Sequence, residues 1–402
     1  MKRVFHGWIV VAVGIVVTCV GFGAMASLTV FLQPMGQAMG WSRTAISTAA
    51  LINWLCFGLG AFVWGALSDR IGTRAVVLAG GVLLGLGLVT ASRATTLAQF
   101  QLLFGVVVGL AAGSFYTPLT ATTMRWFTRH RSLAVALVSA GLSVGSALMV
   151  PLGRWLISVF DWRFAMLLLG DLVWLVIIPA ALLLKDPPAS APAAGPGAGA
   201  AAGGPTVAQA VRTPQFAALA LAYFACCGAH SGPIFHMVTN AIDHGVSSLA
   251  AATVLSVASL ASLTGKIVCG IIADRAGAKR TLVVGLALQA GAIGLYLFAG
   301  RLAAFYGVAL VFGFAYGGVM PLYAILVREY FGARIMGAVF GAVALVSTLG
   351  MALGPWAGGW IYDSFGGYAW LFVGAFAVGL AATAIASTFR APAALASPSP
   401  AG

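Results

Sequence analysis

Long apolar runs, separated by short clusters of charged residues, fill the chain from residue 7 to residue 389. Most of them reach the roughly 20 residues that a helix needs to cross about 30 Å of hydrocarbon. Strands of a membrane barrel would show short segments of alternating polarity instead. Backbone groups in lipid must also be satisfied within the segment, which favours helices. The pattern predicts twelve membrane-spanning helices, over residues 7–33, 42–68, 74–92, 97–125, 132–158, 163–185, 213–241, 248–273, 279–299, 304–328, 334–361 and 367–389.

The first apolar run follows Met1-Lys2-Arg3, as the apolar part of a secretory signal peptide does. It extends from Gly7 to about Leu32, which is too long for a typical signal, and it makes the number of spans even. We therefore expect it to be the first membrane helix.

Composition excludes an ordinary soluble domain, because 61% of residues are hydrophobic and only 7% are charged, against about a quarter in soluble proteins. The formal charge of +13 could indicate a nucleic-acid partner, but the Lys and Arg residues lie at the ends of predicted spans. Five of the 21 fall on one side, one lies inside a span, and fifteen fall on the other side, which predicts cytoplasmic termini in a cell inner membrane. The five are Arg43, Arg93, Arg154, Arg163 and Arg301.

Cysteines lie only inside predicted spans and have no metal-ligand spacing, so we expect neither a metal site nor a cofactor. Residues 186–206 are rich in Ala, Pro and Gly and contain no bulky side chain to bury. We expect a six-helix bundle over 1–185, a flexible cytoplasmic linker over 186–212, a second six-helix bundle over 213–390 and a disordered tail over 391–402.

An internal repeat supports the division into two halves. The loop from Gly65 through Asp69-Arg70 to Arg74 and the loop from Gly270 through Asp274-Arg275 to Lys279 both fit GxxxDRxGx[RK], 205 residues apart. A second pair has the same offset of about 200 residues: Pro118 precedes Arg125 in the fourth span as Pro321 precedes Arg328 in the tenth. Two parallel six-helix repeats are typical of secondary transporters, with the substrate site between the halves.

The repeated loop resembles the corresponding loop of the major facilitator superfamily, which implies an all-α fold of two pseudo-symmetric six-helix bundles. In that family the loop gates the conformational change. The resemblance assigns gating to Gly65, Asp69, Arg70, Arg74, Asp274 and Arg275, with the aspartate packing at a helix N-terminus and Gly65 allowing close approach. The alternative is that these residues only anchor the topology.

Finer resemblance points to the monocarboxylate and oxalate–formate group of that superfamily. It is carried by His6-Gly7-Trp8, by Arg125-Trp126-Phe127 and by Asp161-Trp162-Arg163. This resemblance implies transport of a small organic anion.

Lys266 is the one Lys or Arg that lies deep within a predicted span. It precedes Asp274 by eight residues, which places it about 12 Å from the end of the helix. A charge at that depth costs at least about 2.5–3.5 kcal/mol and therefore indicates a function. Ala61 occupies the matching position of the first half. The related group places a carboxylate-binding Arg here, which implies that Lys266 binds substrate, although as a point charge rather than a planar fork. A structural pair with Asp171 is the alternative.

The eleventh span carries no second cation, so one carboxylate balances the site better than two. Some group members have an aspartate four residues before the cation, where this chain has Ser262. A bacterial lactate transporter of the group has a His and an Asp seven residues apart in the seventh helix, as His236 and Asp243 are. That spacing returns to one helix face, and histidine titrates near neutral pH. Proton coupling is therefore expected at His236 or Asp243, with Asp171 as a further candidate and an ordinary loop carboxylate as the alternative for Asp243.

Further candidates for the substrate cavity are His236, Asn53 and three tyrosines. Tyr316 and Tyr323 lie seven residues apart in the tenth span, and Tyr116 lies near Pro118 in the fourth. Their hydroxyls could bond a carboxylate oxygen, and core packing is the alternative.

The sequence thus predicts a monomeric transporter, surrounded by lipid and without enzymatic activity, that moves a lactate-, pyruvate- or acetate-like anion with a proton by alternating access. One rival is an exporter or antiporter of another organic anion, drug or metabolite. A membrane sensor or enzyme is a second rival, but neither a nucleotide-binding loop nor a Ser/His/Asp arrangement supports it.

Overall fold

The computed structural model describes residues 6–127, 131–186, 206–332 and 335–390, and these are helical almost throughout. They contain twelve helical stretches long and apolar enough to cross a membrane, which confirms the predicted number. The first half comprises α1 (His6–Ala26), α2 (Leu28–Met39), α3 (Arg43–Ile71), α4 (Thr73–Ala91), α5 (Leu97–Phe100), the π-helix η1 (Gln101–Val108), α6 (Gly109–Trp126), α7 (Arg131–Val159) and α8 (Trp162–Leu182). The second comprises α9 (Val207–Ala210), α10 (Pro214–Asp243), α11 (Ser248–Ala276), α12 (Ala278–Leu295), the 3-10 turn η2 (Tyr296–Phe298), α13 (Leu302–Phe331), α14 (Met336–Phe365) and α15 (Ala369–Ser387).

The ends of the spans lie within a few residues of the prediction, except for the first. That span continues as α2 to Met39, where Gly40 adopts the left-handed φ of 67° that ends the helix. The expected linker is helical near its C-terminal end, because Thr206 and Gln209 form a capping box around α9. The rest of it, from 187 to 205, and the expected tail lie outside the described residues.

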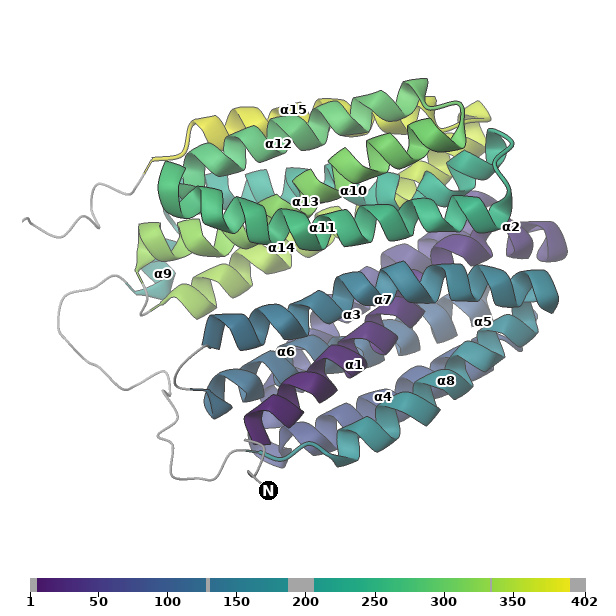
Figure 1. The fold of residues 1–402 in the computed structure, drawn as a ribbon, viewed down its shortest axis with the longest axis horizontal. Coiled ribbons are helices and arrows are strands. Elements are labelled where there is room, and N and C mark those ends of the chain that lie inside the picture. The colour runs from purple at the N-terminus through teal and green to yellow at the C-terminus, as the bar shows by residue number, and fades with distance from the viewer. Residues whose placement is uncertain (1–5, 128–130, 187–205, 333–334, 391–402) are drawn as a thin grey trace, which may run out of the picture.

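The helices form two groups, α1–α8 and α9–α15, which appear as the lower and upper groups in Figure 1. Within the first group, glycines allow close contact: a Cβ on Gly145 of α7 would lie 2.2 Å from the carbonyl oxygen of Cys19 in α1. In the second group, a Cβ on Gly350 of α14 would lie 2.4 Å from the carbonyl oxygen of Phe224 in α10. These close helix pairs are the kind that small residues permit in membranes.

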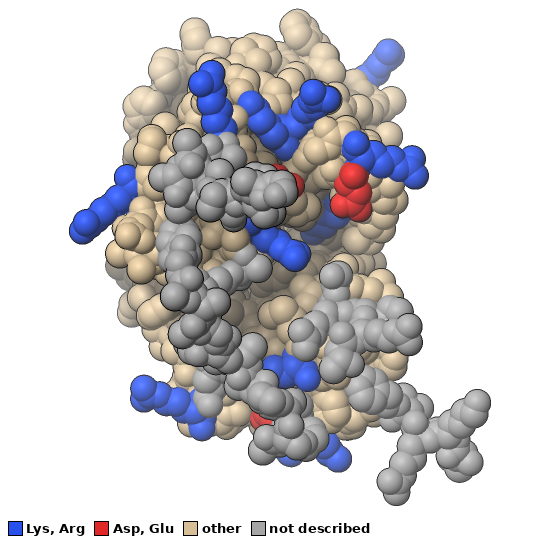
Figure 2. Space-filling model, turned by 90° about the vertical axis from the view of Figure 1, so that its left-hand side faces the viewer, with Lys and Arg blue, Asp and Glu red and all other residues tan. Residues whose placement is uncertain are grey.

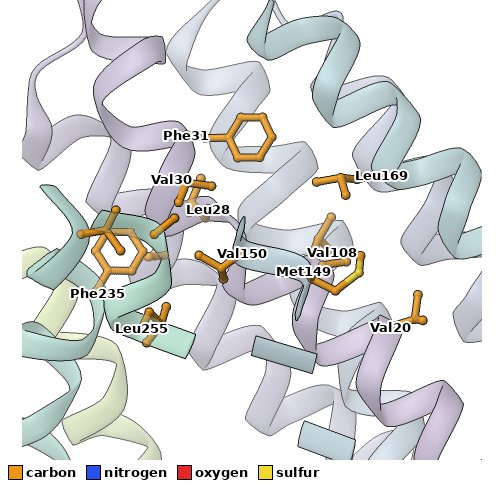
Figure 3. Close-up of a cluster of buried hydrophobic side chains, with 14 of the residues drawn as sticks. Val20, Leu28, Val30, Phe31, Val108, Met149, Val150, Leu169, Phe235 and Leu255 are labelled. Carbon is orange, nitrogen blue, oxygen red and sulfur yellow. The ribbon is translucent and has the colours of Figure 1, made fainter. Parts of the chain in front are cut away.

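The two groups meet along α3 with α14 and α7 with α11. Phe235 and Leu255 of the second half lie close to Leu28, Val30 and Val150 of the first, all of them buried (Figure 3). The hydrophobic core is therefore continuous between the halves in this region, which holds them together near α2.

Basic side chains gather over both halves at the opposite end of the molecule (Figure 2). The space-filling surface is hollowed between the halves on this face. We call this the basic end, and the end at which α2 meets the second half the closed end.

Candidate functional site

Arg43, at the first turn of α3, joins the two halves at the closed end. Its Nη1 and Nη2 donate to the Oδ2 and Oδ1 of Asp243 at 2.7 and 2.9 Å, and this is the one ion pair among the described residues. Nη1 also donates to the hydroxyl of Tyr368 at 2.6 Å, and the guanidinium lies 3.5 Å from the ring centre of Tyr362. The side chains of Arg43 and Asp243 are 15% and 24% exposed, so water screens this bidentate pair only in part.

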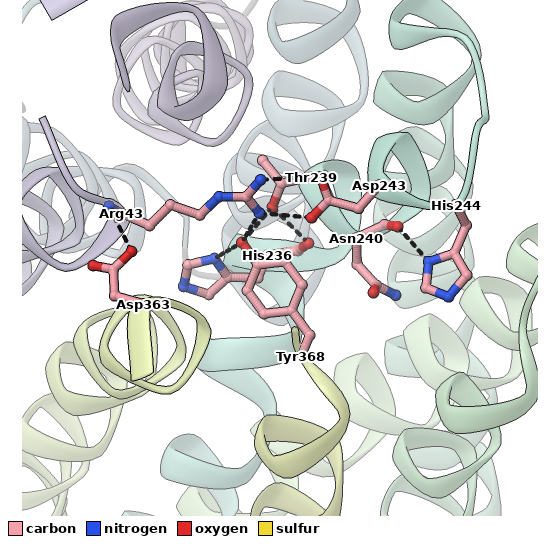
Figure 4. A network of polar contacts seen from close by, with 8 residues as sticks. All are labelled: Arg43, His236, Thr239, Asn240, Asp243, His244, Asp363 and Tyr368. Carbon is pink, nitrogen blue, oxygen red and sulfur yellow. Dashed lines mark hydrogen bonds and ion pairs between the residues drawn. The ribbon is translucent and has the colours of Figure 1, made fainter. Parts of the chain in front are cut away.

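Asp363 of α14 adds a second link between the halves at the same place. Its carboxylate accepts the backbone N–H of Arg43 at 3.2 Å (Figure 4). It also accepts the backbone N–H of Thr44 at 2.7 Å. These are free N–H groups of the first turn of α3, where the helix dipole favours a negative charge. The second half thus provides an anion for the helix N-terminus of the first.

His236 of α10 is fully buried beneath this pair, and its contacts define its tautomer. Nε2 lies 2.8 Å from the carbonyl oxygen of Pro355, which can only accept, so Nε2 carries the proton. Neutral Nδ1 is then an acceptor, and the hydroxyl of Tyr368, 3.1 Å away, donates to it. The Tyr368 oxygen in turn accepts from Arg43 and lies 3.0 Å from the Thr239 hydroxyl. We call Arg43, His236, Asp243, Asp363 and Tyr368 the interdomain cluster.

Burial raises the pKa of Tyr368 to about 12. Its hydroxyl therefore keeps its proton at neutral pH and transmits hydrogen bonds between His236 and Arg43 without changing charge.

Lys266 lies on α11 deep between the halves, largely covered by other residues. Its Nζ donates to the Ser143 hydroxyl of α7, in the other half, at 3.2 Å. It does not form an ion pair with a carboxylate of any described residue. The alternative pairing with Asp171 is therefore wrong for this structure: Asp171 lies on the exposed face of α8.

A cavity of ≈ 100 Å³ lies between the halves, bordered by residues of both. Among the predicted substrate residues, Asn53 and Tyr316 line it. Asn53 donates to the Phe104 carbonyl oxygen, and its side-chain oxygen has no partner among the described residues. The other walls are mainly apolar, and the aromatic ones come from Phe22, Trp54, Phe104 and Phe235.

The other predicted cavity residues lie elsewhere. Tyr323 is fully buried in the second half, donates to the Ala222 carbonyl oxygen and stacks on Tyr223 with ring centres 4.1 Å apart. Tyr116 shares a hydrogen bond of 2.8 Å with the Ser139 hydroxyl within the first half. The arrangement of Tyr323 matches the core-packing alternative in this conformation, whereas Tyr116 is only half-buried.

The repeated loops lie at the basic end. Arg70, Arg74, Asp274 and Arg275 are exposed, and none of them forms an ion pair with another described residue. The side chain of Asp69 is not among those the structure describes. A Cβ on Gly65 would lie 3.3 Å from Thr117 of α6, so this glycine packs against its own half.

Arg43, Asp363 and Tyr368 were not among the residues that the sequence singled out as a site. The signal available was the charge of Arg43 and Asp363 at two predicted span ends, but their partners lie hundreds of residues away in sequence. Tyr368 gave no signal beyond its place at the start of the twelfth predicted span.

Comparison with known proteins agrees with this arrangement. The sequence profile described as Major Facilitator Superfamily matches residues 13–242 and 219–402. The chain belongs to the Major Facilitator Superfamily. The predicted fold and family resemblance are thereby confirmed.

Similar members of this superfamily include named transporters. Monocarboxylate transporter 13 of Bos taurus is 30% identical over 389 residues, covering 95% of this chain and 89% of that protein. Monocarboxylate transporter 11 of Homo sapiens is 30% identical, covering 90% and 78%. An uncharacterized MFS-type transporter of Escherichia coli strain K12, YhjX, is 25% identical and covers 84% of each chain.

Solved structures of superfamily members share the fold. The crystal structure of a bacterial homolog of the human lysosomal transporter Spinster, titled as inward-facing and unoccupied, has a TM-score of 0.78 at 16% identity and covers both chains fully. A mutant form of the nucleoside transporter NupG has a TM-score of 0.75 at 12% identity, covering 95% of this chain and all of the other. At these identities the likeness shows the fold alone.

Proposed function

We propose that this protein is a secondary active transporter that moves a small monocarboxylate together with a proton across a cell inner membrane by alternating access. Membership in a transporter superfamily and relatedness to monocarboxylate transporters support the general function. The substrate, the proton and the cytoplasmic placement of the basic end are our own inferences. The basic side chains at one end support that placement through the positive-inside rule.

The observation that carries the choice of substrate is Lys266. An ammonium group between the halves, bonded to the neutral Ser143 hydroxyl and not to a carboxylate of the described residues, is suited to binding one anion. A carboxylate placed there would bond to a group from each half, because Lys266 lies on α11 and Ser143 on α7. One cation balances one carboxylate, and this pairing lowers the cost of carrying the charge through the closed state.

Proton coupling is assigned to the interdomain cluster, with His236 as its titrating group and Asp243 as the alternative. A proton added at Nδ1 of His236 would turn that nitrogen from an acceptor into a donor, so Tyr368 could no longer donate to it. It would also place a second positive charge beside Arg43, which bonds the same phenol oxygen. A proton on Asp243 would remove the ion pair itself. Either change weakens the closed end.

This arrangement gives a cycle in which the proton and the conformation are linked. When the two halves are separated at the closed end, His236 would be exposed to water and accept a proton. With that end joined, as here, the neighbouring Arg43 would favour release of the proton, together with the substrate, toward the basic end. The exposed Asp171 has no part in this cycle. Arg70, Arg74, Asp274 and Arg275, with Gly65 and Asp69, would come together across the halves only when the basic end closes.

Uptake into proteoliposomes tests the proposal. Purified protein should take up radiolabelled lactate, pyruvate or acetate faster when the interior is alkaline. Lys266→Ala should abolish that uptake, and Lys266→Arg should retain part of it, because the charge remains. Uptake that is unchanged in Lys266→Ala would refute the role of this residue. A screen in which only cationic or neutral compounds are carried would favour a drug or metabolite exporter instead.

A further inference from the structure

The cavity between the halves is larger and more apolar than a two- or three-carbon acid requires. The ≈ 100 Å³ of this cavity counts only the positions that the centre of a water-sized sphere can take, whereas one buried water itself fills about 10–15 Å³. The cavity therefore has room for several water molecules. Cavities with apolar walls stay dry and bind apolar molecules, so these walls would favour an apolar ligand.

Lys266 lies beside this space and not within its lining. Ser259 lines the cavity and lies seven residues before Lys266 on α11, which places the two on one face of the helix. On α7, Ser146 also lines the cavity, and Ser143, the partner of Lys266, lies three residues from it. Along α7, three residues or about 4.5 Å therefore separate the anchoring hydroxyl from the border of the cavity, and along α11 seven residues or about 10 Å separate the two backbone positions.

A carboxylate bound between Lys266 and Ser143 would direct the remainder of its molecule past Ser146 into the cavity. The body of a lactate-sized acid would end near that border. The sides of Phe22, Trp54, Phe104 and Phe235 that line the cavity would then make no contact with the ligand. A six-membered ring attached to the same acid would reach them, and aromatic rings pair favourably with one another.

We propose that the preferred substrates are monocarboxylates with an aromatic or similarly bulky apolar body, bound with the carboxylate at Lys266 and the body in this cavity. This inference rests on the proposed function, because it takes Lys266 as the carboxylate anchor. Small acids such as lactate would bind through the same anchor but more weakly.

Lactate and 3-phenyllactate test this, because they differ by one phenyl group. Binding is measured by thermal shift on the unmodified protein, and transport by uptake into proteoliposomes, with protein-free liposomes as the blank. A single methylene in an apolar pocket changes selectivity about 10- to 200-fold. The half-saturating concentration of phenyllactate should therefore be at least about tenfold below that of lactate.

Two alanines on neighbouring helices provide a matched pair of variants. Ala26 lines the cavity, whereas Ala38 of α2 is exposed outside it. Ala26→Leu should fill part of the cavity and weaken phenyllactate binding more than lactate binding, so that the preference for phenyllactate is lost. Ala38→Leu should change neither phenyllactate binding nor lactate binding.

Failures of the two proposals are distinguishable. Uptake of lactate that depends on Lys266, with phenyllactate binding no tighter, would overturn this inference and leave the proposed function standing. If neither acid binds or moves, the proposed function fails. Tight phenyllactate binding that is unchanged in Lys266→Gln would overturn this inference and the role of Lys266 as the carboxylate anchor.

Discussion

Replacing Arg43 by Gln should open the closed end of the molecule. The change removes the two hydrogen bonds to Asp243, the one to Tyr368 and the contact with the Tyr362 ring. The part-buried ion pair is worth about 2 kcal/mol, between the value for an exposed pair and that for a hydrogen bond to a charged group. The ring contact and the bond to Tyr368 each contribute about 1 kcal/mol or less.

A loss of about 3 kcal/mol corresponds to a shift on the order of a hundredfold in the ratio of closed to open molecules. Gln at this position keeps its backbone N–H, so the bond to Asp363 stays and only the side chain is tested. Asp243→Asn removes the ion pair but leaves the ring contact of Arg43, so we expect a smaller shift. The double variant should shift less than the sum of the two singles, because both remove the same pair.

Distances between spin labels measure this shift directly. Cysteines at Ala38 and Ser247, both exposed at the closed end on opposite halves, would carry the labels in a protein without its native cysteines. Arg43→Gln should move the distance distribution toward longer values. Arg301→Gln, which removes an exposed arginine without an ion pair among the described residues, is the control. An unchanged distribution in Arg43→Gln, or an equal change in Arg301→Gln, would refute the reasoning.

Three further predictions concern coupling, packing and the cavity. His236→Gln should abolish the stimulation of uptake by a proton gradient but keep exchange of substrate between the two sides, as measured by counterflow; stimulation that persists would exclude His236 as the coupling group. Gly145→Ala should lower stability in detergent by about 1–3 kcal/mol in a melting assay, because the new methyl would overlap a backbone oxygen 2.2 Å away. Gly153→Ala, whose new methyl would lie 3.5 Å from its nearest atom, should be nearly neutral in the same assay. Tyr323→Phe should cost about 1 kcal/mol of stability and leave substrate affinity unchanged, whereas Tyr316→Phe should change affinity; the reverse outcome would place the cavity elsewhere.

The membrane spans could be predicted because their signal is local. Each apolar run carries its own evidence of length and of charge at its ends, and twelve of them stand out in a chain with 7% charged residues. Lys266 is detectable for the same reason, since one charge inside an apolar run needs no knowledge of its neighbours. The break that separates α1 from α2 at Ser27 has no comparable signal in the sequence.

The closed end could not be predicted, because its contacts depend on how the two halves meet. Arg43 counts in the sequence only as a cation at a span end, and its partner Asp243 lies 200 residues away. The spacing of His236 and Asp243 did indicate a common helix face, and the structure joins both to Arg43, one through Tyr368 and one directly. The roles of His236 and Asp243 in proton coupling remain predictions.

Tyr316 and Tyr323 show the limit of periodicity. Seven residues return a side chain to the same face but move it about 10 Å along the axis. At the level of Tyr316 the face of α13 lines the cavity, and at the level of Tyr323 it packs on Tyr223 of α10. What a helix face contacts thus changes along its length, and a single sequence does not record where.

The start of α3 has two caps, one from each half, and only one of them is lost when the halves separate. Ser42, in the same half, accepts the N–H of Ala45 at 3.1 Å, while the N–H groups of Arg43 and Thr44 bond to Asp363 across the boundary. When the halves separate, these two N–H groups would bond to water at an exposed helix end. The hydroxyl of Ser42 would still prevent the first turn from fraying. The contact between the halves can therefore break and re-form in every transport cycle without refolding of α3. The Arg43 side chain is then already positioned to bind Asp243 when the halves meet again.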